Sequence, residues 1–203
     1  DPEDDDKNNN QSLLRTEYTV SAVVLRCINE GSIEAKKEAV GGIVGGMDLG
    51  FVSECESYGD VEGTNKVGGI AGTSSAKLLS NWAKCALTGK KYVGGIVGQG
   101  TDGLLTGNSC VAKENRAIVD IRADSGKKND DNSGIASGDT DTNTQYWGAI
   151  SGGQDGEFVG NLFVSDALAG IDRVSRAGQA EPTTFEAIRA LEGAPAGFQK
   201  LTL

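Results

Sequence analysis

A glycine-rich hexapeptide that recurs three times limits the folds open to this chain. The sequence reads VGGIVG from Val40, VGGIAG from Val67 and VGGIVG again from Val93, at intervals of 27 and 26 residues. A period of this length is typical of solenoids, propellers and repeat arrays. Glycine at this density would cost about 1 kcal/mol per residue in helix interiors, which disfavours a helical repeat. A propeller blade needs roughly 40 residues, more than the interval provides.

We therefore predict an all-β fold, a right-handed β-solenoid with coils of about 27 residues and three short strands in each coil. Equivalent residues of successive coils then lie about 4.8 Å apart, the strand spacing of a sheet. The hexapeptide is interpreted as a strand plus a corner that each coil rebuilds. Period-2 alternation puts Val40 and Val44 on one face and Ile43 on the other, so the pattern leaves open which face is the core.

The cysteines repeat at a similar interval. Cys27, Cys55, Cys85 and Cys110 are separated by 28, 30 and 25 residues, and glycine follows the first three after four residues. This register predicts one inward-facing ladder of cysteines and a third coil that is trimmed at one corner. Buried free thiols are the favoured state, and disulfides between neighbouring coils are the alternative. A cysteine metal site is disfavoured because the chain has no C-x2-C pair.

The same residues resemble a known repeat family. The three hexapeptides, preceded by CINEG, CESYG or CALTG, are similar to the GLUG repeat over roughly residues 20–115, although no glycine follows Cys110 at position 114. GLUG repeats occur in bacterial surface adhesins and in non-catalytic regions of IgA-specific metallopeptidases. The resemblance implies a non-catalytic structural or adhesive module of a larger bacterial cell-surface or secreted protein. An accessory region of an IgA-specific type metallopeptidase and a carbohydrate-binding or carbohydrate-active β-helix are the alternatives.

Composition along the chain predicts three parts. These are an acidic N-terminal tail at 1–18, a GLUG-type solenoid at 19–165 with a polar loop inserted at 124–145, and a C-terminal capping segment at 166–203. A helix is predicted near 183–192, because Thr183 and Glu186 have the spacing of a capping box. Phe185, Ile188 and Leu191 would share one face of this helix.

Charge and residue usage narrow the function classes. The formal net charge of −10 argues against nucleic-acid binding and against docking on anionic membranes. The chain has no histidine, which excludes a His-dependent triad or an HExxH zinc site within it. We therefore expect no catalytic residue, no cofactor, no metal site and no membrane insertion. The expected location is extracellular or at the cell surface, with host or neighbouring-cell glycans or proteins as candidate partners.

Two weaker patterns remain as alternatives. Asp139, Asp141 and Asn143 alternate as oxygen ligands do in calcium loops, but residues 139–145 are interpreted as a solvated loop because later ligand positions are missing. Tyr146, Trp147, Trp82 and Tyr92 are a candidate stacking platform for sugar rings. Because adjacent strand residues face opposite ways, at least one of Tyr146 and Trp147 should lie in the core.

Overall fold

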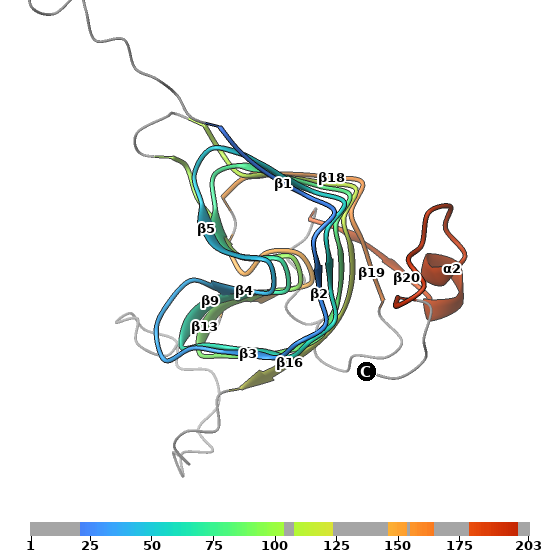
Figure 1. The fold of residues 1–203 in the computed structure, drawn as a ribbon, viewed down its shortest axis with the longest axis horizontal. Helices are drawn as coiled ribbons and strands as arrows, with labels where there is room; N and C mark the ends of the chain where they lie inside the picture. Colours follow the sequence, from blue (N-terminus) through green and yellow to red (C-terminus); the bar gives the residue numbers. More distant parts are fainter. Residues whose placement is uncertain (1–20, 104–107, 124–145, 154, 165–178, 199–203) are drawn as a thin grey trace, which may run out of the picture.

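The structure is a computed structural model that describes residues 21–103, 108–123, 146–153, 155–164 and 179–198. These residues form short parallel strands and one short helix, which confirms the all-β prediction and fits a solenoid (Figure 1). The expected tail at 1–18, the loop at 124–145 and its calcium-like pattern at 139–145 lie outside the described residues.

The described strands form four sheets, which we name A to D. Sheet A contains β1 (Ala22–Leu25), β6 (Gly50–Ser53), β11 (Lys77–Leu79), β15 (Val111–Lys113) and β18 (Glu157–Val159). Sheet B contains β2 (Ile28–Asn29), β3 (Ile33–Glu34), β7 (Glu56–Ser57), β8 (Val61–Glu62), β12 (Trp82–Gly89), β16 (Arg116–Ala123), β19 (Leu162–Val164) and β20 (Glu181–Thr183). Sheet C contains β4 (Val40–Gly41), β9 (Asn65–Gly68), β13 (Lys91–Gly94) and β17 (Trp147–Gly148). Sheet D contains β5 (Val44–Met47), β10 (Ala71–Ser74) and β14 (Val97–Gly100).

The register between coils shows where the chain leaves the stack. Equivalent residues are 28 apart from Cys27 to Cys55 and 26 apart from Cys55 to Asn81. The separation rises to 34 from Asn81 to Asn115 and to 46 from Asn115 to Asn161. The extra residues fall between β14 and β15 and between β16 and β17. Both excursions start from corners, where a solenoid accepts insertions without breaking its ladders.

The hexapeptide folds as a strand, a tight reversal and a second strand. Its first two residues lie in sheet C and its fifth in sheet D, so Val67 and Ala71 belong to different sheets. Alternation therefore does not hold across it, and Val67, Ile70 and Ala71 are all fully buried. The reversal presses on sheet B, because a methyl group at Gly69 would lie 2.8 Å from the Cβ of Ala83. Only glycine allows this approach. The fold of the hexapeptide also explains why the first three coils contribute to four sheets and not to the three short strands of the prediction.

A fourth copy of the hexapeptide is present in altered form. Residues 147–152 read WGAISG, which keeps glycine at the second and sixth positions and isoleucine at the fourth. The register pairs Val93 with Trp147 and Val97 with Ser151. The regular interval does not reach this copy, because residues 124–145 precede it in the chain, and the cysteine spacing marks Cys110 as the next repeat.

The prediction of one cysteine ladder is wrong. Cys27 and Cys55 are in register, and the amide of Cys27 donates to the Cys55 Sγ at 3.4 Å. In the third coil, however, the equivalent position is held by Asn81, and Cys85 lies four residues later in β12. Cys110 immediately precedes β15 in sheet A. The prediction that the third coil is trimmed at one corner is also wrong. It depends on treating Cys85 as equivalent to Cys27 and Cys55, whereas Asn81 holds that position.

The prediction of buried free thiols is confirmed for three of the four cysteines and is wrong for Cys27. All four cysteines are free, and Cys55, Cys85 and Cys110 are buried, whereas Cys27 is exposed. Burial raises the pKa of the Cys85 thiol to about 12. It raises the pKa of the Cys110 thiol to about 12 as well. These two side chains therefore act as small apolar fillers of the core.

The predicted helix is present in shorter form as α2 (Phe185–Arg189). Its N-cap is Thr184, whose hydroxyl accepts from the amide of Ala187 at 3.1 Å, and not Thr183 as the capping-box spacing indicated. Ile188 is fully buried, and Phe185 and Leu191 pack beside it, as predicted.

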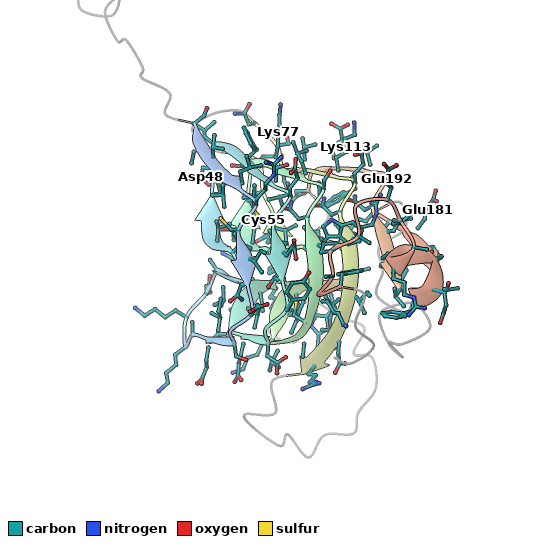
Figure 2. The ribbon with its side chains drawn as sticks, turned by 45° about the vertical axis from the view of Figure 1, so that its right-hand side comes forward. Asp48, Cys55, Lys77, Lys113, Glu181 and Glu192 are labelled. Carbon is teal, nitrogen blue, oxygen red and sulfur yellow. The ribbon has the colours of Figure 1, made fainter. Side chains whose placement is uncertain are left out.

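The segment 179–198 contacts the side of the stack as well as its end. Strand β20 continues sheet B beyond β19, while α2 stands against the outer face of that sheet (Figure 2). Phe198 is fully buried and meets the Trp82 ring edge to face, with centroids 4.8 Å apart. Tyr58, one coil earlier, packs against the same cluster. The capping segment is predicted at 166–203, and its described part, 179–198, is a lateral brace beside several coils.

Candidate binding groove

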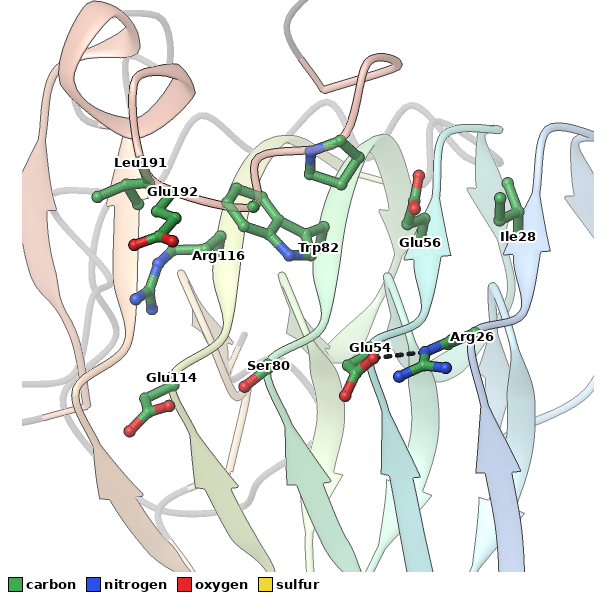
Figure 3. Close-up of a pocket in the computed structure, with 12 residues that line it drawn as sticks. Arg26, Ile28, Glu54, Glu56, Ser80, Trp82, Glu114, Arg116, Leu191 and Glu192 are labelled. Atoms are coloured by element: carbon green, nitrogen blue, oxygen red, sulfur yellow. Dashed lines mark hydrogen bonds and ion pairs between the residues drawn. The ribbon is translucent and has the colours of Figure 1, made fainter.

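Sheets A and B meet at a corner where successive coils place residues in the left-handed backbone region. Arg26, Glu54, Ser80 and Glu114 have φ between 52° and 56°, and Gly160 continues this row at 61°. A non-glycine residue in this region costs about 1–3 kcal/mol and persists only where its surroundings fix it. We call the outward side chains of Arg26, Glu54, Ser80 and Glu114 the corner row (Figure 3).

From the second coil onward, the residue after each corner residue is buried and supports the corner, whereas Cys27, which follows Arg26 in the first coil, is exposed. Asn81, Asn115 and Asn161 are buried here. The Oδ1 of Asn115 accepts from the backbone amide of Asn81 at 3.0 Å, and its Nδ2 donates to the Leu78 carbonyl at 2.9 Å. Asn161 repeats the arrangement one coil later, donating to the Ala112 carbonyl at 2.9 Å. This asparagine ladder satisfies buried backbone groups of neighbouring coils, which offsets the strain of the corner row.

A second outward row lies on sheet B beside the corner row. Ile28, Glu56, Trp82 and Arg116 are in register from the first coil to the fourth. Because strand side chains alternate, their neighbours point inward, as the fully buried Ala83 shows. We call Ile28, Glu56, Trp82 and Arg116 the sheet row.

The loop after α2 completes a groove. Leu191, Glu192, Gly193 and Pro195 line it opposite the two rows, and its volume is ≈ 700 Å³. Figure 3 shows Trp82 between Arg116 and Glu56, at the middle of the sheet row. Since both rows connect equivalent residues of successive coils, the groove runs across the strands and along the stack. The C-terminal brace is thus one of its walls.

Ionic groups in the groove have partners close by. The Arg26 Nε lies 2.7 Å from Glu54 Oε2, and both side chains are largely exposed. The Tyr58 hydroxyl donates to Glu56 Oε2 at 2.5 Å. Burial, with this bond to Glu56 as a further cause, raises the pKa of Tyr58 above its ordinary range, so the hydroxyl remains a donor. These contacts fix carboxylates in place along the groove.

Arg116 is held in the groove by backbone acceptors. Its Nη1 donates to the carbonyl of Gly160 at 2.9 Å and to the carbonyl of Asn115 at 3.0 Å. Partial burial lowers the pKa of the Arg116 guanidinium from its ordinary value, although arginine stays charged in proteins. The guanidinium is therefore a fixed positive group beside Trp82.

The predicted aromatic platform is not assembled as one site. Tyr92 and Tyr146 stack with ring centroids 4.8 Å apart and an interplanar angle of 9°, and Lys91 Nζ is 5.3 Å from each centroid. Trp147 packs against the core, which confirms that one of the adjacent pair lies inside. Trp82 is on sheet B, in the groove. The stacked tyrosines cover each other's faces, whereas Trp82 lines an open concavity.

The groove was not anticipated from the sequence, although one signal pointed to its corner. The tetrapeptides SNWA, ENRA and GNLF, around Asn81, Asn115 and Asn161, mark the same position of three coils. An alignment on these asparagines would have placed Trp82 and Arg116 in one row. The wall at 191–195 has no such signal, because it depends on tertiary packing of the brace.

In comparisons with known proteins, no family model, curated protein or solved structure matches the chain. Among the described residues, no cluster of three or more Cys, Asp or Glu side chains could hold a metal ion. No helix in the described part of the chain is long and apolar enough to cross a membrane.

Proposed function

We propose that this chain is a non-catalytic adhesive module of a larger bacterial cell-surface or secreted protein. It belongs to the GLUG type and forms a right-handed solenoid with coils of about 27 residues. It acts by presenting the groove along its stack to an extended partner, such as a glycan or protein of a host or neighbouring cell.

The groove carries this proposal. Solenoids offer long, stiff surfaces suited to extended partners. Here the outward rows are fixed from inside by the asparagine ladder, so the groove is preorganised before a partner arrives. Two of its carboxylates already have partners, since Glu54 forms an ion pair with Arg26 and Glu56 accepts a hydrogen bond from Tyr58. Carboxylates held in this way are better suited to positioning a ligand than to transferring a proton.

Bead adhesion tests the proposal. Beads coated with the full 203-residue chain are passed under flow over bacterial lawns and epithelial monolayers, beside albumin-coated beads. We expect retention at least about tenfold above albumin on one of the surfaces, since many weak contacts combine by avidity. Retention equal to albumin on every surface contradicts an adhesive role.

A further inference from the structure

We propose that the groove binds an uncharged oligosaccharide, which lies along the stack with one sugar ring against Trp82. This inference rests on the proposed adhesive function and names the chemical class of its partner.

The composition of the groove favours a sugar. An indole offers a flat apolar surface to the C–H face of a pyranose, while carboxylates and a guanidinium bind ring hydroxyls. Trp82 has both kinds of polar group beside it, Glu56 on one side and Arg116 on the other (Figure 3). An apolar centre with a few convergent polar groups is the usual character of a ligand pocket.

The direction of the groove disfavours a peptide strand. An extended peptide gains most of its affinity by adding to a free sheet edge. The groove instead crosses strands whose two edges are already paired, since β12 is bonded to both β7 and β16. Successive coils are about 4.8 Å apart, which is close to the length of one pyranose unit. Successive sugars would therefore meet side chains at equivalent positions of successive coils.

Charge selects against acidic glycans. Four carboxylates line the groove, those of Glu54, Glu56, Glu114 and Glu192, against the guanidiniums of Arg26 and Arg116. The whole chain carries a formal charge of −10, which adds to the repulsion of anions. An uncharged chain of hexoses or N-acetylhexosamines avoids this repulsion and can still accept and donate hydrogen bonds.

The test is isothermal titration of the full chain with four hexasaccharides. Cellohexaose, N-acetylchitohexaose and maltohexaose are the neutral probes, and hexagalacturonate is the acidic probe. We expect at least one neutral probe to bind with a Kd below about 1 mM, and the acidic probe to bind about tenfold more weakly or not at all. Absence of binding by all three neutral probes, or tighter binding of hexagalacturonate, overturns the proposal.

Variants locate the site. Trp82→Ala should weaken binding by about tenfold or more, as for a central aromatic contact. Because Trp82 also packs on Phe198, a second variant, Glu114→Gln, tests the groove without removing a contact to Phe198. The exposed Glu114 side chain forms an ion pair with Lys113 at 3.7 Å. We expect Glu114→Gln to weaken binding about threefold or more, and Glu62→Gln, exposed at the far end of β8, to leave it unchanged. Equal affinity for Glu114→Gln and Glu62→Gln, with Trp82→Ala folded and binding normally, overturns the assignment.

The bead experiment separates the two proposals. If coated beads adhere and no neutral hexasaccharide binds, the sugar inference is wrong and the adhesive function stands. If a hexasaccharide binds and beads do not adhere, the adhesive function is wrong and the site assignment stands.

Discussion

The side-chain amide of Asn81 donates a hydrogen bond of 3.0 Å to Oδ1 of Asn115, a residue 34 positions later in the chain. This bond joins two coils that the insertion after β14 separates in the sequence. The Nδ2 of Asn115 in turn donates to the Oδ1 of Asn161 at 3.0 Å. Each asparagine thereby satisfies backbone groups that the corner would otherwise bury unpaired. The ladder is thus the internal support of the groove outside it.

Removing one rung should be costly. Asn115→Ala leaves the buried Asn81 amide without its acceptor, at about 1–3 kcal/mol for the orphaned group, and removes the side-chain donor to the Leu78 carbonyl. We expect the free energy of unfolding in urea to fall by roughly 3 kcal/mol. The control is Asn65→Ala, whose amide reaches an exposed Glu38 at 3.2 Å and should change stability by less than about 0.5 kcal/mol. Similar losses of unfolding free energy in both variants would contradict the supporting role of the asparagine ladder.

The tight reversal within the hexapeptide predicts that alanine is destabilising at Gly69 and tolerated at Gly31. A methyl group at Gly69 would strike the Gly95 carbonyl and the Cβ of Ala83, so Gly69→Ala should destabilise the chain by about 1–3 kcal/mol or prevent folding. At Gly31 the nearest atom to an added Cβ is Asn29 Oδ1 at 3.7 Å, an ordinary contact. Gly31→Ala should therefore be close to neutral in thermal denaturation. A tolerated Gly69→Ala would show that the reversal does not press on sheet B.

Stability should fall at alkaline pH partly because of Cys85. Burial raises the thiol pKa from its ordinary 9.0 to about 12, so the folded chain keeps a proton that the unfolded chain releases. Its contribution to stability is complete below pH 9 and is lost as the pH rises toward 12. Urea midpoints measured at pH 7.5, 9.5 and 10.5 should decline more steeply in the native chain than in Cys85→Ala. Because Cys110 and the lysines titrate in both proteins, parallel declines would refute the assignment.

The thiols should also differ in reactivity. Cys27 is exposed, whereas Cys55, Cys85 and Cys110 are buried, and only a solvent-accessible thiolate reacts quickly. With a thiol-reactive dye at pH 8 and no denaturant, we expect fast labelling of Cys27 alone. The other three should label after unfolding in urea. Peptide mapping of the fast phase that recovers dye on Cys85 would contradict the described core.

The lateral brace should detach when its anchor is truncated. Phe198 is fully buried against Trp82, and Phe→Ala changes in such positions cost about 3–5 kcal/mol. Since this energy holds one segment to the stack, Phe198→Ala should expose residues 179–198 to limited proteolysis while the coils stay protected. Phe51→Ala, which truncates a half-buried side chain on the outer face of sheet A, is the control and should leave the brace protected. Unchanged cleavage in Phe198→Ala would mean that the brace is held elsewhere.

Sequence patterns predicted the parts of this fold that depend on repetition. The hexapeptides at Val40, Val67 and Val93 predicted the register between the first three coils, in which Val67 pairs with both of the other valines. This signal exists because backbones packed this closely tolerate only glycine. The cysteine spacing predicted the wrong register. Cys85 follows Cys55 at nearly the repeat interval, but Asn81 holds the position equivalent to Cys55 in the third coil. The groove was beyond prediction because Trp82 acquires its setting from a loop more than 100 residues later, through packing that leaves no period in the sequence.

The two tryptophans provide the most direct measurement on the groove. Trp82 lines it, whereas the Nε1 of Trp147 is buried against the core, so their indole N–H signals in a ¹H–¹⁵N correlation spectrum serve as reporter and internal reference. Assignment comes from Trp82→Phe, and the titrant is the neutral hexasaccharide with the highest affinity. We predict that the Trp82 signal shifts in a saturable manner while the Trp147 signal stays in place. A Trp82 signal that does not move at saturating sugar would contradict the groove as the binding surface.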